Sequence, residues 1–280
     1  MPELPEVETI ARGLAKRVSG DVIESVWIGR KKEPLKSPAA EIAAVLEQTR
    51  IAEVRRMGKH IVFDLDRAAS FPSANGRKTK TNAKSQWIVH LGMTGRLQVC
   101  EAQAEIAKHT HAILKLASGR ELRFVDPRRF GRLSVAAGFD AAGIEPLEID
   151  RGRFIALFRG RKTPIKSALL NQKLLRGVGN IYADEALFRA GIRPRRRAAS
   201  LSRDSLVKLH ATVQEVLKEA ISLGGSSVSD YVNADGEEGF FQLEHRVYGR
   251  EGEPCLLCQT PIKRVVIAGR SSHYCPKCQK

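Results

Sequence analysis

The chain has 280 residues and a formal net charge of +16, from 47 Lys and Arg against 31 Asp and Glu. This length is sufficient for substantial hydrophobic cores and predicts two domains. No apolar run approaches the length of a membrane span, and the acidic N-terminus lacks the basic and apolar segments of a signal peptide. We therefore expect a cytoplasmic protein with no membrane partner.

The positive charge is concentrated in two parts of the chain. Residues 151–203 contain 14 Lys or Arg against two acids, and the last 26 residues contain no acid. Residues 204–254, which separate them, carry 10 acids against four bases. This distribution indicates a localised surface for a polyanion such as nucleic acid, although positive charge can also serve only solubility.

The first residues, Met1-Pro2-Glu3, allow two interpretations. The apolar pattern of residues 4–14, with Glu6 and Glu8 near its start, is typical of an amphipathic helix, and Pro2-Glu3 then only precede it. Alternatively, removal of Met1 leaves the secondary amine of Pro2 as a nucleophile, because an α-amino group titrates near pH ~8 against ~10.4 for lysine. Glu3 would donate or accept the proton.

Residues 22–135 are predicted to form mainly strands. Apolar residues alternate over 61–65, and residues 111–125 contain two strands around a turn at 118–119, while a short helix is expected at 39–47. Lys59 precedes a strand and is most simply a solvated end. Residues 70–85 are predicted to be an exposed basic loop, and Cys100 a half-buried strand residue.

The segment Asp126-Pro-Arg-Arg-Phe-Gly131 follows a strand. Arg128 and Phe130 are two residues apart, so on an extended backbone they project to one side, suitable for contacting a base edge and wedging into a base stack. A surface arginine beside a core phenylalanine is the simpler alternative. Met93, in the turn of residues 91–95, and His109 also have ordinary structural explanations.

Residues 135–150 break the periodicity and are the predicted linker. Helices are then expected over 154–158, 165–170 and 181–188, and a fourth is capped by Ser202 and ended by two glycines at 224–225. Gly177 and Gly179 lie in a helix-to-helix turn that allows close approach of a ligand, and Asn180 caps the next helix or contacts a phosphate. An ordinary turn would look similar.

Four cysteines have the spacing C-x₂-C-x₁₆-C-x₂-C: Cys255, Cys258, Cys275 and Cys278. This spacing predicts one zinc ion, and four sulfur ligands leave no open position, so the zinc is structural. Two disulfides are the alternative, which a cytoplasmic location disfavours.

In their order and spacing these motifs resemble the formamidopyrimidine-DNA glycosylase family over essentially the whole chain. The segments that carry the resemblance are residues 1–9, 91–95, 126–131 and 177–188, and Val247-Tyr-Gly-Arg250 before the cysteines. Residues 4–8 resemble this branch rather than the related endonuclease VIII branch, which acts mainly on oxidised pyrimidines.

The resemblance implies an α+β fold in four parts. These are an N-terminal helix with a β-sandwich (residues 1–134), a linker (135–150), a helical domain with a helix-two-turns-helix motif (151–245) and a zinc-binding β-hairpin (246–280). DNA is expected between the two domains. The implied activity is excision of 8-oxoguanine and formamidopyrimidines from double-stranded DNA, followed by β,δ-elimination at the abasic site, by a monomer associated with the nucleoid.

The resemblance also implies a role for individual residues. Pro2 attacks C1′ as the Schiff-base nucleophile, Glu3 donates a proton to the sugar, Lys59 transfers a proton in β-elimination and Arg270 acts in δ-elimination. The residues implied to contact DNA are Met93, His109, Arg128, Phe130, Arg161 and Asn180, and residues 226–238 form a loop over the extruded base.

Three departures from the family pattern are present. Asn171 replaces a usual aspartate, Ser272-His273 replaces a common Thr-Phe pair, and the loop of residues 70–85 is long. The second departure puts the placement of Arg270 in doubt. The alternatives to the implied function are a glycosylase of the same fold for oxidised pyrimidines and a non-catalytic zinc-containing DNA-binding protein.

Overall fold

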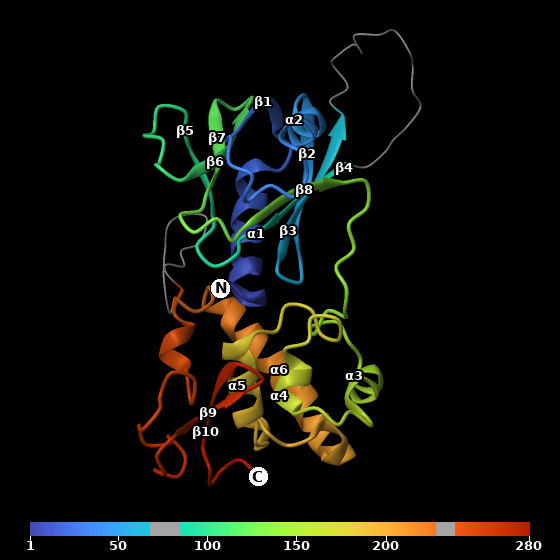
Figure 1. Cartoon of the computed structure of the whole chain (residues 1–280), viewed down its shortest axis with the longest axis vertical. Coiled ribbons are helices and arrows are strands. Elements are labelled where there is room, and N and C mark those ends of the chain that lie inside the picture. Colours follow the sequence, from blue (N-terminus) through green and yellow to red (C-terminus); the bar gives the residue numbers. More distant parts are fainter. Residues whose placement is uncertain (68–84, 228–238) are drawn as a thin grey trace. The chain divides into compact units, whose positions relative to one another are not determined.

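A computed structural model describes residues 1–67, 85–227 and 239–280 (Figure 1). The predicted loop at residues 70–84 and residues 228–238 of the second predicted loop lie outside the described residues. In chain order the elements are α1 (Leu4–Val18), β1 (Val22–Ile28), α2 (Ala39–Leu46), β2 (Thr49–Met57), β3 (His60–Arg67), β4 (Ser85–His90), β5 (Arg96–Glu101), β6 (Thr110–Leu116), β7 (Arg120–Val125), β8 (Arg132–Ala136), α3 (Arg151–Phe158), α4 (Ile165–Leu169), α5 (Asn180–Ala190), the 3₁₀ turn Ala198–Ser200, α6 (Arg203–Ser222), the 3₁₀ turn Phe241–Glu244, β9 (Lys263–Ile267) and β10 (Arg270–Tyr274).

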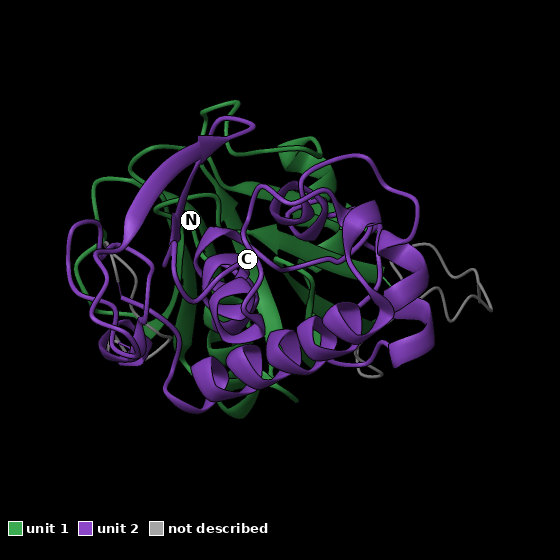
Figure 2. Cartoon of the chain, turned by 90° about the horizontal axis from the view of Figure 1, so that it is seen from below, with its two compact units in different colours: residues 1–2, 6–140, 228–238 green, residues 3–5, 141–227, 239–280 purple. Residues whose placement is uncertain are grey.

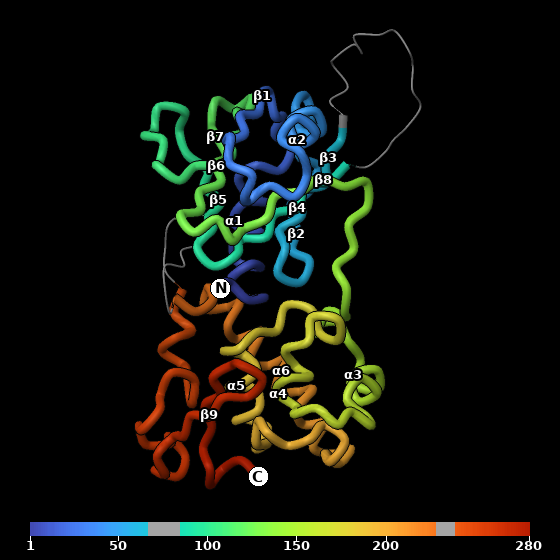
Figure 3. The backbone as a smooth tube through the Cα atoms, in the orientation of Figure 1, coloured from blue at the N-terminus to red at the C-terminus, as the bar shows by residue number. Residues whose placement is uncertain are grey.

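The chain forms two compact units, coloured separately in Figure 2. Among the described residues, unit 1 contains residues 1–2, 6–67 and 85–140, and unit 2 contains residues 3–5, 141–227 and 239–280. The path of the chain through each unit can be followed in Figure 3. The backbone of residues 3–5 therefore belongs to a different unit from the residues on either side of it.

Unit 1 is built on eight strands in the order β5-β7-β6-β1-β2-β3-β4-β8, and every neighbouring pair is antiparallel. Strands β1 and β2 pair at only two positions, so the sheet has two four-stranded halves joined at this corner. Inward residues of both halves, including Phe63, Trp87 and Phe124, share one core with Leu14 of α1. The halves thus form the two layers of the predicted sandwich.

Unit 2 is helical, with a terminal hairpin. Ser202 caps α6 by accepting a hydrogen bond from the Ser205 N–H at 3.1 Å, as its sequence position predicts. The apolar stripe of α6 packs with α3, α4 and α5 in a core that also contains Leu4. Strands β9 and β10 form the hairpin, whose turn residues Ala268 and Gly269 both have positive φ, as a tight two-residue hairpin turn requires.

Among the described residues, no helix has both the length and the apolar character needed to cross a membrane.

Candidate functional site

Glu3 is held by the glycine turn that precedes α5, within unit 2. Its carboxylate accepts a hydrogen bond from the Ile181 N–H at 3.3 Å, and the Leu4 N–H donates to the Gly177 carbonyl at 3.0 Å. A Cβ atom at Gly179 would lie 2.0 Å from the Glu3 Cδ, so a larger residue there would displace the Glu3 carboxylate. The close approach predicted for this turn is therefore made to the chain's own Glu3, and the helix dipole of α5 favours the negative charge of that carboxylate.

Asn180 is the first residue of α5, but it does not cap the helix. The N-cap is Gly179, and no side chain accepts a capping hydrogen bond there. The Asn180 amide instead donates to the Ser271 hydroxyl on β10 at 3.4 Å. The capping interpretation was wrong because the glycine turn brings Glu3 to the first free N–H groups of the helix.

Met93, Arg128 and Phe130 lie together on unit 1 and point to solvent. The Arg128 Nη1 lies 2.6 Å from the Met93 Sδ, and its guanidinium lies 4.7 Å from the centre of the Phe130 ring. Phe130 is 54% exposed and Met93 41%. An exposed phenylalanine stacked under an arginine excludes the simpler core-phenylalanine interpretation, and it presents an apolar wedge beside a hydrogen-bond donor.

Asp126, fully buried, organises the two loops that carry these residues. One carboxylate oxygen accepts from the Thr94 hydroxyl at 2.6 Å and from the Arg128 N–H at 3.2 Å, and the other accepts from the Gly131 N–H at 2.8 Å. The Asp126 N–H also donates to the His109 carbonyl at 3.0 Å. This role of Asp126 was not predicted from the sequence, although an Asp before a Pro-containing turn is a recognised signal for such hydrogen bonds.

Lys59 is buried, which contradicts the expectation of a solvated strand end. It lies in the turn between β2 and β3 and is 9% exposed. The ring of the next residue, His60, lies 5.1 Å from that of His90 on β4. Burial lowers the pKa of His60. Burial, together with the interactions with His60, Arg132 and Lys59, lowers the pKa of His90 to about 4. Both imidazoles are therefore neutral near pH 7, which limits the positive charge around Lys59.

The four cysteines form a metal site. Their Sγ atoms all lie within 4.8 Å of one another, and the pairs Cys255–Cys278 and Cys258–Cys275 are separated by 3.9 and 3.5 Å. Tetrahedral zinc with Zn–S bonds of about 2.3 Å needs sulfur atoms about 3.8 Å apart, so the residues fit the ion. The cysteines are free and too far apart for disulfides, which overturns that alternative.

Helix α5 also fixes the chain that enters the zinc module. The fully buried Glu185 accepts hydrogen bonds from the backbone N–H groups of Arg246, Val247 and Tyr248 at 2.9–3.1 Å. Burial raises the pKa of Glu185 in spite of these bonds. The role of Glu185 could not be predicted from the sequence, because only the tertiary structure shows which backbone donors surround its carboxylate.

Of the remaining predicted site residues, Pro2 is partly buried, whereas Arg270, Arg161 and His109 are exposed. Arg270 is the first residue of β10 and directly follows the hairpin turn. Arg161 lies after α3, where its guanidinium donates to the Leu157 carbonyl, and His109 precedes β6. These three arginine and histidine side chains are accessible to a ligand; Arg161 and Arg270 belong to unit 2 and His109 to unit 1.

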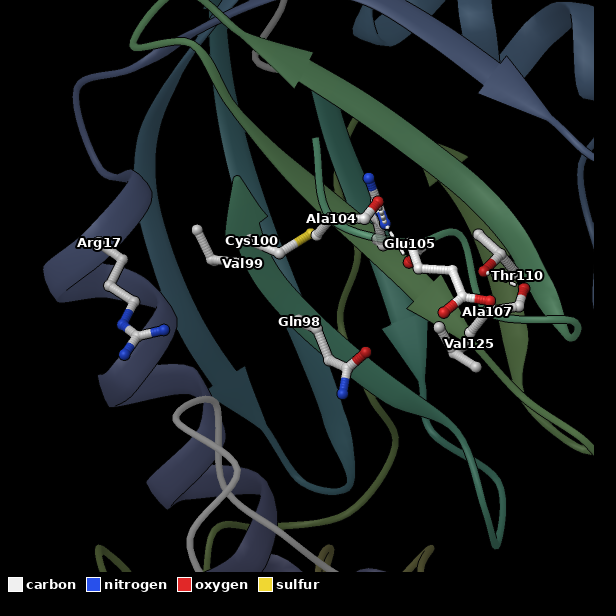
Figure 4. A pocket seen from close by; sticks show the side chains of 10 residues that line it. Arg17, Gln98, Val99, Cys100, Ala104, Glu105, Ala107, Thr110 and Val125 are labelled. Carbon is white, nitrogen blue, oxygen red and sulfur yellow. Dashed lines mark hydrogen bonds between the residues drawn. The ribbon is translucent and has the colours of Figure 1, made fainter. Parts of the chain in front are cut away.

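A separate cavity of about 270 Å³ lies in unit 1 (Figure 4). Its lining comes from α1, β5, β7 and residues 104–110, and it includes Cys100 and Arg123. The Arg123 guanidinium is already used, because it binds the Glu121 carboxylate at 2.7 Å and the Ala104 and Glu105 carbonyls. Among the described residues, none of the predicted catalytic or DNA-contacting residues lines this cavity.

Comparison with known proteins matches three family models along the chain. The N-terminal domain of formamidopyrimidine-DNA glycosylase matches residues 1–133, the H2TH domain of the same family matches residues 143–232, and a zinc finger found in FPG and IleRS matches residues 252–280.

Individual relatives are similar over the full length. A formamidopyrimidine-DNA glycosylase of Solibacter usitatus is 44% identical over 100% of both chains. A solved structure of the Lactococcus lactis FPG (MutM) with DNA containing Fapy-dG has a TM-score of 0.84 at 32% identity, covering 99% of this chain and 100% of that one. A structure of MutM with DNA containing carbocyclic 8-oxo-G has a TM-score of 0.86 at 32% identity and covers 100% of both.

Proposed function

Because this chain belongs to the formamidopyrimidine-DNA glycosylase family, we propose that it excises oxidised purines from double-stranded DNA and then cleaves the strand at the abasic site. The substrate class follows from the relatives, whose structures contain Fapy-dG and 8-oxo-G DNA. It acts as a monomer on the cytoplasmic nucleoid. Residues 1–134 and 151–245 bind and process the DNA, and residues 246–280 hold one structural zinc ion.

The observation that carries the proposal is the placement of Glu3. Its carboxylate lies at the N-terminus of α5, in a turn where a Cβ atom at Gly179 would collide with it. This contact fixes the residue that directly follows Pro2. An ordinary helix start needs no such anchor, whereas a reactive N-terminal amine must be held in a defined position.

The reaction starts at the amine of Pro2 once Met1 has been removed. The nitrogen forms a bond to C1′ as the bond from C1′ to the damaged base breaks, and Glu3 donates a proton to the sugar oxygen as the ring opens. The resulting iminium makes the C2′ proton acidic. Loss of that proton, with Lys59 in proton transfer, expels the 3′ phosphate, and a second elimination assisted by Arg270 expels the 5′ phosphate.

The wedge of Met93, Arg128 and Phe130 serves base extrusion. C1′ cannot be reached inside a stacked duplex, so the damaged nucleotide must leave the stack. Phe130 and Met93 fill the gap, and the Arg128 guanidinium hydrogen-bonds the orphaned cytosine. His109, Arg161 and Asn180 contact phosphates, which fix the register of the DNA without reading its sequence.

Borohydride trapping tests the proposal. Reduction in the presence of a duplex with 8-oxoguanine opposite cytosine is expected to give a covalent protein–DNA adduct, and Pro2→Gly is expected to abolish it. Mass spectrometry of the starting protein checks that Met1 is absent, because a retained methionine acylates the amine. If the processed protein forms no adduct, it is not a glycosylase of this type; if the Pro2→Gly adduct persists, another amine is the nucleophile.

Excision of thymine glycol separates the proposal from a glycosylase for oxidised pyrimidines. The proposal expects excision of 8-oxoguanine to be faster than that of thymine glycol in otherwise identical duplexes. The reverse order would place the chain with the pyrimidine-specific enzymes.

A further inference from the structure

The residues that follow Arg270 on β10 are held by side chains of α4 and α5. The Asp184 carboxylate on α5 accepts a hydrogen bond from the His273 N–H at 2.9 Å, and its second oxygen lies 2.7 Å from the Lys166 Nζ. Lys166, on α4, donates to the Ser271 carbonyl at 2.6 Å. Asp184 thus connects two helices to two backbone positions of one strand.

This cluster is sealed from solvent. Asp184, Lys166 and His273 are 0%, 1% and 7% exposed. Burial lowers the pKa of Lys166, while the charge of Asp184 acts in the opposite direction. A buried ion pair contributes little net stability because both charges lose their water, so its retention is better explained by the geometry that it fixes.

The strand geometry relates the cluster to Arg270. Side chains alternate between the two faces of a strand, and Ser271 and His273 both contact α5, through Asn180 and Asp184. Arg270 therefore points to the opposite face, where it is exposed. Arg270 directly precedes the anchored Ser271 and lies three positions before the anchored His273. A shift of β10 along α5 would therefore move the Arg270 guanidinium by a similar distance.

We propose that Asp184 is a positioning residue for Arg270: it fixes the register of β10 on α5 and so places the guanidinium for the second elimination step. This inference rests on the proposed function. The departure at Ser272-His273 is compatible with this role, because the bond to Asp184 uses the His273 backbone N–H, which any non-proline residue supplies. The centre of the His273 ring lies 5.1 Å from that of the Tyr248 ring.

The test is the product distribution of Asp184→Asn on a duplex with a preformed abasic site. β-Elimination leaves an unsaturated aldehyde on the 3′ end, and δ-elimination converts it to a 3′ phosphate. A displacement of about 1 Å costs roughly 100-fold in a positioned step, so we expect the rate of 3′ phosphate formation to fall at least tenfold. Borohydride trapping is expected to stay within about threefold, because Pro2 and Glu3 are not displaced.

One control variant and one second test variant complete the experiment. Asp204→Asn removes the same charge from an exposed position at the start of α6 and should leave the product distribution unchanged. Lys166→Met with Asp184→Leu replaces the buried pair by apolar side chains of similar size, which usually preserves folding, and removes both bonds to β10. This double variant should show the same loss of 3′ phosphate, with one zinc per chain measured by metal analysis.

Each result has a defined meaning. A normal product distribution in Asp184→Asn or in the double variant would overturn the positioning role. Parallel loss of trapping, zinc and 3′ phosphate in both variants would also overturn it, since Asp184 would then support folding instead. Absence of trapping in the unmodified protein would refute the proposed function, which is a separate outcome.

Discussion

Asp126→Asn tests whether one buried carboxylate organises the wedge. Asparagine keeps one oxygen for Thr94 and the Arg128 N–H, but it turns an amide NH₂ toward the Gly131 N–H, which now donates to the carboxylate at 2.8 Å. Losing the hydrogen bond to the charged carboxylate, and leaving the buried Gly131 N–H without an acceptor, costs about 2–4 kcal/mol. If the state in which Phe130 and Met93 are inserted into the base stack is destabilised by about 3 kcal/mol, excision slows by about 100-fold.

The assay compares two substrates under single-turnover conditions. Excision of 8-oxoguanine from a duplex is expected to fall by about 100-fold, while borohydride trapping on a single-stranded abasic oligonucleotide, which has no stack to fill, should change by less than about threefold. Asp66→Asn is the matched control, because its carboxylate is 46% exposed on the same unit. An equal fall on both substrates, or a fall below threefold on the duplex, would refute the reasoning.

Three further predictions follow from individual contacts. Gly179→Ala places a Cβ 2.0 Å from the Glu3 Cδ, so excision and borohydride trapping should both fall at least about tenfold. Gly138→Ala is the control and should be neutral, because nothing lies within 4 Å of a Cβ at that position. Equal activity of the two variants would contradict the anchoring of Glu3. Chelation of zinc should weaken DNA binding before unit 1 unfolds, as followed by fluorescence anisotropy and circular dichroism, and unchanged binding by metal-free protein would argue against a role for the hairpin. The pKa of His90 is lowered to about 4 from its usual ~6.5, so between these pH values the unfolded chain binds a proton that the folded chain does not. The contribution of His90 to the free energy of unfolding is therefore fully present above pH ~6.5, and stability falls by up to about 3 kcal/mol toward pH 4. Urea unfolding of His90→Gln at several pH values should show a shallower dependence, and an identical slope would exclude this assignment.

The local sequence pattern was sufficient to predict most of the helices and strands. The Ser202 cap, the helix of residues 4–18 and the zinc cysteines all depend on residues that are near one another in sequence, and their geometry is dictated by helix periodicity and turn chemistry. The wedge was less certain, because spacing alone cannot distinguish an exposed Phe130 from a core residue. Its 54% exposure decides between them.

The sequence by itself determined the family resemblance, the zinc site and the two chemical candidates at the N-terminus. Only the tertiary structure decided where Glu3 is anchored, since Ile181 lies 178 positions further along the chain. The same is true of the buried Lys59 and of Asp184 beneath β10. Burial and hydrogen bonding between distant segments depend on which surfaces the whole chain packs together, and no local pattern records that choice.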